Sequence, residues 1–484
     1  MKRIPIIILM LQLCICQAAA QDDYDDFLNS IKKEYASFRD QANKEYADFM
    51  EKAWKSYGIK RSAEKPKKED VPIKYDKEKD EEGEKVIEAE VIPFKEEPKP
   101  QPKPIEPIKE NIQAPKAETF MYYGTPMSVR WGNAEKFKLA GVNEKTLAKA
   151  YRELTSSAYN NLLHDCLELR KKYTLCDWAY YKMLEILAGT ICGKETNEAV
   201  FLQGVLFHQS GYMMRFALNP DDKSLHLLVR IDGVAYDSGY TSVGGKIFFL
   251  LDGSKLKNLQ VCEASYPGEK EMSFLIPKLP KLDVELSKER QIISRFVNVE
   301  AKIAVNKNMI NFFNDYPSTY NNQDIMTSWA FYANTPVTKE VRENMYPQLK
   351  ERLGNATPLM AANLLLNWVQ MGFEYAIDQK VWGGERAFFA EESLYYPLCD
   401  CEDRAILYSH LVRELLGLDV LLVYYPEHLY TAVCFNEDVK GDYFMVDGRK
   451  FTVADPTYYM ANVGKTMNRM DNSKAKVILL KNRR

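Results

Sequence analysis

The stretch Asp400-Cys401-Glu402-Asp403-Arg404-Ala405 opens an apolar run with helical spacing that stops at Gly417. It places a cysteine at the expected start of a helix, where unpaired N–H groups and the helix dipole stabilise a thiolate. His428 then heads a strand-like run, and Asp455 follows another within Ala454-Asp455-Pro456-Thr457. The chain has only five histidines, so a histidine at this place favours a role in chemistry.

The three residues predict a Cys-His-Asp triad. In such a triad His428 takes the proton of the Cys401 thiol and delivers it to the leaving amine, while Asp455 orients the imidazole and stabilises its charged form. Each residue alone also has an ordinary structural explanation: a small buried thiol, a strand histidine with satisfied hydrogen bonds, and an Asp-Pro turn. The joint arrangement favours catalysis, because a helix start, a strand start and a strand end can converge at one edge of a sheet.

These three segments resemble the transglutaminase-like core. DCEDRA is similar to the family's (G)DCxxxA segment, with Cys401 as nucleophile; EHLYTAVCF is similar to its histidine strand, with His428 as base; VADPTYY is similar to its DPT segment, with Asp455 as third member. The resemblance covers about residues 355–460 and departs from the family at Cys399, where a glycine often stands, and at Leu429. It implies thiol-dependent acyl transfer but no particular substrate, since the family includes cross-linkers, peptidases, amidases and non-catalytic members.

Further site residues are expected around the triad. In the family, a side chain from the helix before the cysteine often helps to stabilise the oxyanion, and Trp368 and Gln370 both carry a donor on such a helix. Trp368 is equally well explained as a core residue. Trp382 and Arg386 bound a shaped loop before the nucleophile, and with Tyr430 they are the predicted residues of a substrate groove.

No metal or organic cofactor is expected. A zinc site built from Cys399, Cys401, Cys434 and His428 lacks the CxxC spacing of zinc motifs. Papain-like peptidases separate cysteine and histidine by ~130 residues, and the interval here is far shorter. A net charge of −3 gives no electrostatic case for nucleic-acid binding.

Residues 1–20 are typical of a secretory signal, with a positive start, an apolar stretch and Ala18-Ala19-Ala20 as cleavage site. The apolar stretch is shorter than the roughly 20 residues that a membrane helix needs. Cys14 and Cys16 raise a lipoprotein alternative, which ranks second because large residues precede them. We therefore predict an exported protein, periplasmic or secreted. The remaining cysteines are odd in number, so at least one thiol stays free or pairs with another molecule.

Two segments precede the globular part. Residues 23–55 form three 11-residue units, DYDDFLNSIKK, EYASFRDQANK and EYADFMEKAWK, which predict an amphipathic helix over 21–58 with one aromatic stripe. The stripe either packs on the protein's own body or serves a protein partner or self-association through 23–57. Residues 59–117 are rich in Lys, Glu and Pro, which predicts a disordered linker.

The globular part is predicted to be α+β, with a second α+β domain at 118–345 before a transglutaminase-like catalytic domain at 346–484. Helices are expected at 143–169, 177–188, 199–208, 356–375 and 401–416, and a strand meander follows the last of them. The run from Glu195 to Gly211 mirrors that from Cys401 to Gly417, and His226-Leu227 mirrors His428-Leu429. Residues 140–255 are therefore a candidate degenerate copy of the core, with Glu195 in place of the nucleophile; the alternative is an unrelated domain.

Three functions remain open from the sequence. The first is an exported thiol enzyme that acts on amides of proteins, peptides or cell-wall material. The second is a non-catalytic envelope scaffold that keeps the fold for binding, and the third is an assembly protein whose N-terminal helix recruits partners. An intact triad favours the enzyme, whereas a buried and inert Cys401 favours the scaffold.

Overall fold

The computed structural model describes residues 39–65, 74, 84–94, 101–105, 108, 117–131, 137–155, 160–320, 324–467 and 474–480. The predicted signal sequence and the first units of the 11-residue repeat lie outside these ranges. Within them the fold is a mixed α+β structure with mainly antiparallel sheets, as the sequence predicts. None of the described helices has the length and apolarity needed to span a bilayer.

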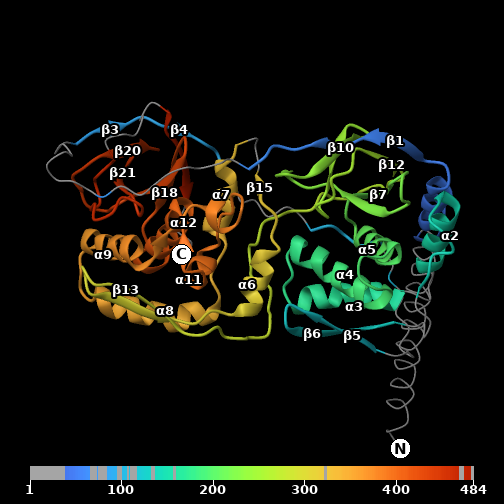
Figure 1. Ribbon diagram of the computed structural model, residues 1–484, viewed down its shortest axis with the longest axis horizontal. Coiled ribbons are helices and arrows are strands. Elements are labelled where there is room, and N and C mark those ends of the chain that lie inside the picture. Colours follow the sequence, from blue (N-terminus) through green and yellow to red (C-terminus); the bar gives the residue numbers. More distant parts are fainter. Residues whose placement is uncertain are drawn as a thin grey trace, which may run out of the picture.

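Two halves lie side by side, each with a sheet above helices and a hairpin below them (Figure 1). The first half, residues 117–276, contains β5 (Ala117–Tyr122), β6 (Thr125–Arg130), α2 (Glu144–Leu154), α3 (Asn160–Lys172), α4 (Asp177–Cys192), α5 (Asn197–Gln209), β7 (Met214–Leu218), β8 (Leu225–Val229), β9 (Val234–Ala235), β10 (Gly239–Val243), β11 (Lys246–Leu250) and β12 (Asn258–Cys262).

The second half, residues 290–480, begins with β13 (Arg290–Ser294), β14 (Val299–Ile303), α6 (Lys307–Asn314), β15 (Thr319–Tyr320), α7 (Met326–Asn334), α8 (Lys339–Leu353) and α9 (Pro358–Gly372). It continues with β16 (Glu374–Tyr375), α10 (Asp378–Val381), α11 (Ala390–Tyr395), β17 (Leu398–Cys399), α12 (Cys401–Leu411), β18 (Val420–Tyr425), β19 (His428–Val433), β20 (Tyr443–Val446), β21 (Arg449–Ala454) and β22 (Lys476–Leu480).

The two main sheets have the same strand order. The first runs β12-β7-β8-β11-β10 and the second runs β22-β18-β19-β21-β20, with antiparallel neighbours throughout. The supporting helices also correspond: α5 packs on β7, β8 and α4, as α12 packs on β18, β19 and α9. Each half further has a hairpin against two helices, β5–β6 with α3 and α4, and β13–β14 with α8 and α9. We infer from this shared topology that the halves are copies of one unit.

Each sheet is closed by a short piece of the N-terminal segment. β1 (Trp54–Gly58) pairs with β12, and β2 (Lys60–Arg61), which follows almost at once, pairs with β10 at the opposite edge. In the second half, β3 (Val86–Ile87) pairs with β20, and β4 (Glu90–Val91) pairs with β22. Neighbouring residues therefore bridge both edges, and each sheet becomes a closed barrel without a free edge.

These strands correct two sequence-based predictions. The helix expected over 21–58 ends at residue 50 where it is described, because 54–58 is drawn into the first barrel by pairing with β12. The linker predicted to be disordered over 59–117 contains strands, with Ile87 and Ile92 buried. Its few apolar residues gain ordered partners only in the folded sheet. The parts at 66–73, 75–83 and 95–100 lie outside the described residues.

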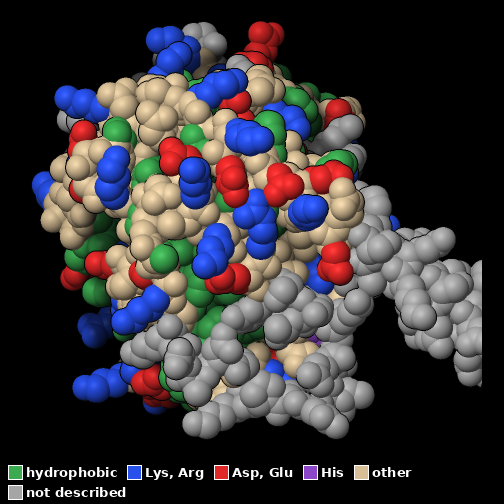
Figure 2. All heavy atoms as spheres, turned by 90° about the vertical axis from the view of Figure 1, so that its right-hand side faces the viewer, with side chains coloured by type: hydrophobic (Ala, Val, Ile, Leu, Met, Phe, Trp, Pro, Cys, Tyr) green, Lys and Arg blue, Asp and Glu red, His purple; other side chains and the backbone are tan. Residues whose placement is uncertain are grey.

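The helix at 39–50 packs on the first half. Tyr46 is buried and stacks on Tyr266 at 4.9 Å between ring centroids, whereas Phe49 is 53% exposed. The aromatic stripe of the last repeat unit is thus divided between the protein's own core and solvent. The surface of this side of the molecule mixes basic and acidic side chains with no large field of one sign (Figure 2).

The predicted boundary between residues 345 and 346 is wrong, because it falls inside α8. The hairpin β13–β14 belongs to the second half: the Trp368 indole N–H donates to the carbonyl oxygen of Ile292 at 3.1 Å, and Ser294 Oγ donates to Asn367 Oδ1 at 2.6 Å. The second half therefore begins near residue 290. The segment between 286 and 347 had no clear periodicity, so the sequence did not reveal the boundary.

Candidate active site

Cys401 is the first residue of α12, as the sequence predicts, with Asp400 as the N-cap residue. The backbone N–H of Asp400 donates to Asp403 Oδ2 at 3.2 Å, which closes the first turn. α12 packs against β18 and against β19, the strand that begins with His428. The Cys401 side chain is 0% exposed. The sulfur is therefore shielded from solvent in this structure.

His428 and Asp455 form a buried pair. His428 is the first residue of β19, and Asp455 directly follows β21, its neighbour in the sheet. His428 Nε2 lies 2.9 Å from Asp455 Oδ2, and the side chains are 2% and 3% exposed. The second oxygen of Asp455 accepts the N–H of Thr457 at 2.8 Å. Because Asp455 binds Nε2, proton exchange with a thiol falls to Nδ1.

Gln370 positions the loop that carries Asp455. Its Nε2 donates to the carbonyl oxygens of Asp455 at 3.0 Å, Tyr458 at 2.8 Å and Ala461 at 3.0 Å. Its Oε1 accepts the N–H of Met460 at 3.2 Å. The predicted oxyanion role does not fit this geometry, because the amide donors are committed to backbone oxygens. The sequence pointed to Gln370 as a site residue, but its role in the structure is to position the loop and not to stabilise an oxyanion.

Trp368 and Tyr430 are also placed differently from the expected roles. Trp368 is fully buried and its indole N–H is used by Ile292, so the core interpretation fits and the oxyanion role does not. Tyr430 is 1% exposed, which excludes it from an open groove. Its ring stacks on His428 at 5.6 Å between centroids. Burial raises the pKa of Tyr430 well above its usual range, so Tyr430 acts as a neutral support for the imidazole.

Trp382 and Arg386 lie on the loop before the nucleophile, as predicted. The Arg386 guanidinium stacks over the Trp382 ring at 4.3 Å and pairs with Glu392 at 2.6 Å. The N–H of Arg386 donates to Asp378 Oδ2 at 2.6 Å. Trp382 remains 37% exposed. These contacts fix the backbone of the loop and leave the indole partly open to solvent.

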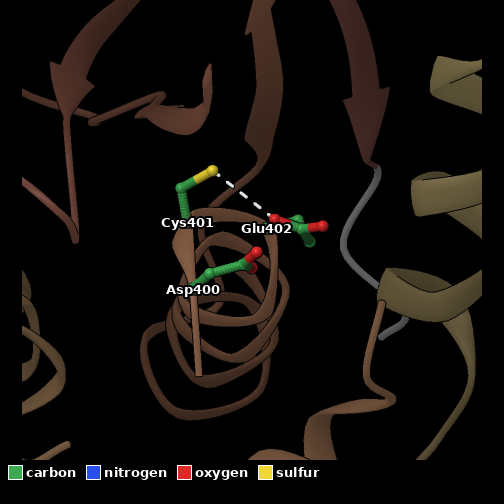
Figure 3. A group of neighbouring side chains, drawn as sticks. All are labelled: Asp400, Cys401 and Glu402. Atoms are coloured by element: carbon green, nitrogen blue, oxygen red, sulfur yellow. Dashed lines mark hydrogen bonds between the residues drawn. The ribbon is translucent and has the colours of Figure 1, made fainter. Parts of the chain in front are cut away.

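Carboxylates crowd the start of α12, which the sequence analysis missed. Oxygens of Asp378, Glu385, Asp400 and Glu402 come within 4.8 Å of one another. The Cys401 thiol donates to Glu402 Oε2 at 3.4 Å, with the Asp400 carboxylate beside it (Figure 3). Burial, with the charges of Asp378 and Glu402 nearby, raises the pKa of Asp403 well above its usual range. A negative charge at this place opposes formation of a thiolate.

These oxygens are the ones that could hold a hard cation such as Ca²⁺, but the chain itself already supplies a positive charge. The Lys65 ammonium donates to the carbonyl oxygen of Glu385 at 2.8 Å. Burial holds the pKa of Lys65 below its usual value, although the charges of Asp237 and Asp378 oppose this shift. The zinc alternative finds no support within the described ranges, since His428 and Cys434 belong to neither of the ligand clusters there.

The cysteines at 166, 176, 192, 262, 399, 401 and 434 are all free thiols. Cys399 allows a comparison with Cys401, because it lies two residues away and is similarly buried, at 3% exposure. The proposed triad does not include it. Burial raises the pKa of Cys399 to about 11. Cys399 is thus an inert internal standard for the reactivity of Cys401.

Arg404 was also missed as a structural residue of this site. It is fully buried and donates to the carbonyl oxygens of Phe373 at 2.8 Å and Gln370 at 3.3 Å, and to the Tyr459 hydroxyl at 3.3 Å. The signal in the sequence was a charged residue, Arg404, within the predicted apolar helix at 401–416. Arg404 ties α12 to α9 and to the loop after Asp455.

Comparison with known proteins gives no match: no family model, no curated protein and no solved structure matches the chain.

Proposed function

We propose that the protein is a thiol-dependent acyl-transfer enzyme of the transglutaminase-like type, acting on amides of proteins, peptides or cell-wall material. The observation that carries the proposal is the buried His428–Asp455 pair, 2.9 Å apart, with His428 at the start of β19, against which the helix of Cys401 packs. Export, inferred from residues 1–20, remains part of the proposal.

In the proposed reaction the thiol proton of Cys401 passes to His428 Nδ1 as Sγ bonds to the amide carbonyl carbon. Collapse of the tetrahedral intermediate breaks the C–N bond, and the proton leaves with the amine. Water or an amine then attacks the thioester and regenerates the thiol. Asp455 stabilises the imidazolium through Nε2, and Gln370 holds the Asp455 loop in place.

The test is the pH dependence of Cys401 alkylation, read by mass spectrometry with Cys399 as internal standard. An activated thiol titrates at roughly 3.5–7.5, against ~8.5 for a free cysteine. Rapid labelling of Cys401 at pH 6 that is lost in His428→Ala supports the enzyme. Glu402→Gln should speed the labelling further, because it removes a negative charge beside the sulfur; Glu391→Gln, another buried carboxyl, is the control.

The scaffold is the second candidate, and the complete burial of Cys401 favours it. In a scaffold the thiol is only a packed helix-start residue. Cys401 would then label as slowly as Cys399, and His428→Ala would change nothing. That result would reject the catalytic proposal.

A further inference from the structure

An apolar groove lies beside the candidate active site. It has a volume of about 810 Å³ and lies between the end of α9, β16 and the loop after β21. Its apolar and aromatic lining includes Phe296, Phe373, Tyr375, Ile377, Tyr459 and Met460. Ligand sites typically have this size and character. Phe296 and Met460 are 62% and 39% exposed, so the groove presents large apolar groups to solvent.

The groove is continuous with the elements that carry the triad. Tyr375 of its floor pairs with Cys399 in a parallel ladder, and β17 ends two residues before Cys401. Its wall, Tyr459 and Met460, belongs to the loop that starts at Asp455 and is held by Gln370. A ligand in the groove is therefore next to β17, which leads into α12, and next to the loop that begins at Asp455.

The wall accepts extended backbone. Tyr459 forms a parallel β-bridge with Lys74, a residue far away in the sequence. A strand paired at this wall projects alternate side chains to opposite faces, so one set enters the groove. Addition of an extended peptide to exposed backbone, with pockets that select alternate side chains, is a common mode of peptide recognition.

We propose that this groove is the acyl-donor site and takes an extended polypeptide with a large apolar side chain, aliphatic or aromatic, near the attacked amide. The assignment of the groove as an acyl-donor site rests on the proposed function. The assignment as a peptide-binding site rests on the groove alone. It narrows the substrate from amides in general to peptides with a bulky apolar residue.

Binding of fluorescent peptides to full-length Cys401→Ala protein tests this without any turnover. The probes are extended peptides that differ at one position, Phe or Leu against Gly or Glu, and the readout is fluorescence anisotropy. We expect the apolar probes to bind at least about 10-fold more tightly, as a hydrophobic pocket allows. Equal affinities for all four probes would overturn the proposal.

Phe296→Ser tests the location. Phe296 is largely exposed, so the variant is expected to fold, and it should lose most of the apolar preference. Phe49→Ser, at a similarly exposed residue on the helix at 39–50, is the matched control and should keep it. An unchanged preference in Phe296→Ser would place peptide binding elsewhere and reject the groove.

If no probe binds, residues 66–83 are replaced by a Gly/Ser linker of equal length. Binding that appears only then means that the chain's own segment at Lys74 competes for the wall, which agrees with a peptide groove. Absence of binding in both proteins rejects the proposal. Apolar preference together with an inert Cys401 would instead reject catalysis and leave a peptide-binding protein, so the two failures are distinguishable.

Discussion

The two halves share a topology but differ where the chemistry is expected. α12 begins with Cys401, whereas α5 begins with Asn197. The Asn197 side chain donates to the carbonyl oxygen of Lys223 at 3.1 Å and accepts the N–H of Leu225 at 2.7 Å. In the first half, the residue that begins the helix therefore stabilises the turn before β8 through these two hydrogen bonds. The position predicted for the missing nucleophile, Glu195, lies before the helix, and Asn197 takes that place.

Strand pairing also shifts the second expected equivalence. Met214 pairs with Val229 as Val420 pairs with Val433. His428 lies five residues before Val433, and the residue five positions before Val229 is Ser224. By the same count His226 corresponds to Tyr430. His226 and His428 are therefore not equivalent in register, although each stands near its strand's start.

The acid, by contrast, is equivalent. Val229 pairs with Phe249 as Val433 pairs with Thr452, and three residues further on stand Asp252 and Asp455. His226 Nδ1 lies 2.7 Å from Asp252 Oδ2, but these side chains are 14% and 40% exposed. A histidine–acid pair thus occurs in both halves, and what distinguishes the second is burial and a thiol at the helix start.

The largest predicted effect follows from this difference. Asp455→Asn preserves the shape but cannot hold an imidazolium, so we expect hydrolysis of a peptide amide with a large apolar residue to fall about 10⁴-fold, the loss seen when a triad aspartate becomes asparagine. Asp252→Asn should leave the rate unchanged within about twofold. Equal losses in both variants would mean that the first half takes part in the chemistry.

The elements around the triad were predictable from local signals. The apolar runs that become α12, β18 and β19 have clear periods, and Gly417, with φ 69°, ends its helical run because only glycine adopts that conformation easily. The positions of Cys401, His428 and Asp455 could be predicted because all three residues fall at ends of such elements.

What the sequence could not provide depends on distant partners. Strands of two residues such as β3 and β4 exist only because the barrel edges pair with them. The donors of Gln370 and Trp368 were recognised, but their acceptors lie in other segments. The carboxylate cluster was missed for the same reason, since Asp378 reaches the start of α12 from α10 and Glu385 reaches it from the loop after α10.

The second prediction compares the two halves through buried glutamines. Gln370 satisfies three carbonyl oxygens, whereas Gln203 of α5 makes one long bond, 3.4 Å, to the carbonyl oxygen of Tyr181. Loss of a buried partner costs about 1–3 kcal/mol for each group. Gln370→Leu should therefore lower the free energy of unfolding by about 3 kcal/mol in urea denaturation, and Gln203→Leu by about 1 kcal/mol. A reversed order would show that the Asp455 loop does not depend on Gln370.

The acids of the two halves also titrate in opposite directions. In the first half, burial tends to raise the pKa of Asp252, but hydrogen bonds from His226 and Ser254 outweigh burial and lower this pKa. Hydrogen bonds from Lys55 and Tyr57 likewise lower the pKa of Glu263. In the second half, burial raises the pKa of Glu391 and of Glu392 to about 7. Asp252 and Glu263 of the first half are thus held as anions, whereas Glu391 and Glu392 of the second half take up protons as the pH falls below about 7.

The smallest predicted effect is a pH dependence that differs in sign between the two halves. Above its unfolded pKa of about 4.3, Glu391 keeps its proton only when folded, so unfolding releases a proton and stability falls as the pH rises towards 7. The slope is at most about 1.4 kcal/mol per pH unit for each such group. The first half should respond in the opposite direction. Its lowered acids lose stability only below about pH 4.5, but burial and the charge of Arg215 hold the pKa of His208 well below its usual range. Unfolding therefore takes up a proton below about pH 6.5, and the stability of this half rises between pH 5 and 7.

Hydrogen exchange of peptides from each half, corrected for intrinsic rates, measures this difference. We expect protection of the second half to decrease from pH 5 to 7 while that of the first half increases. Glu391→Gln should flatten the response, because a neutral side chain at this place still accepts from Thr338 but has no proton to release. Parallel slopes in both halves would show that the buried carboxyls are not the origin, and the contrast between a charged and a protonated half would fail.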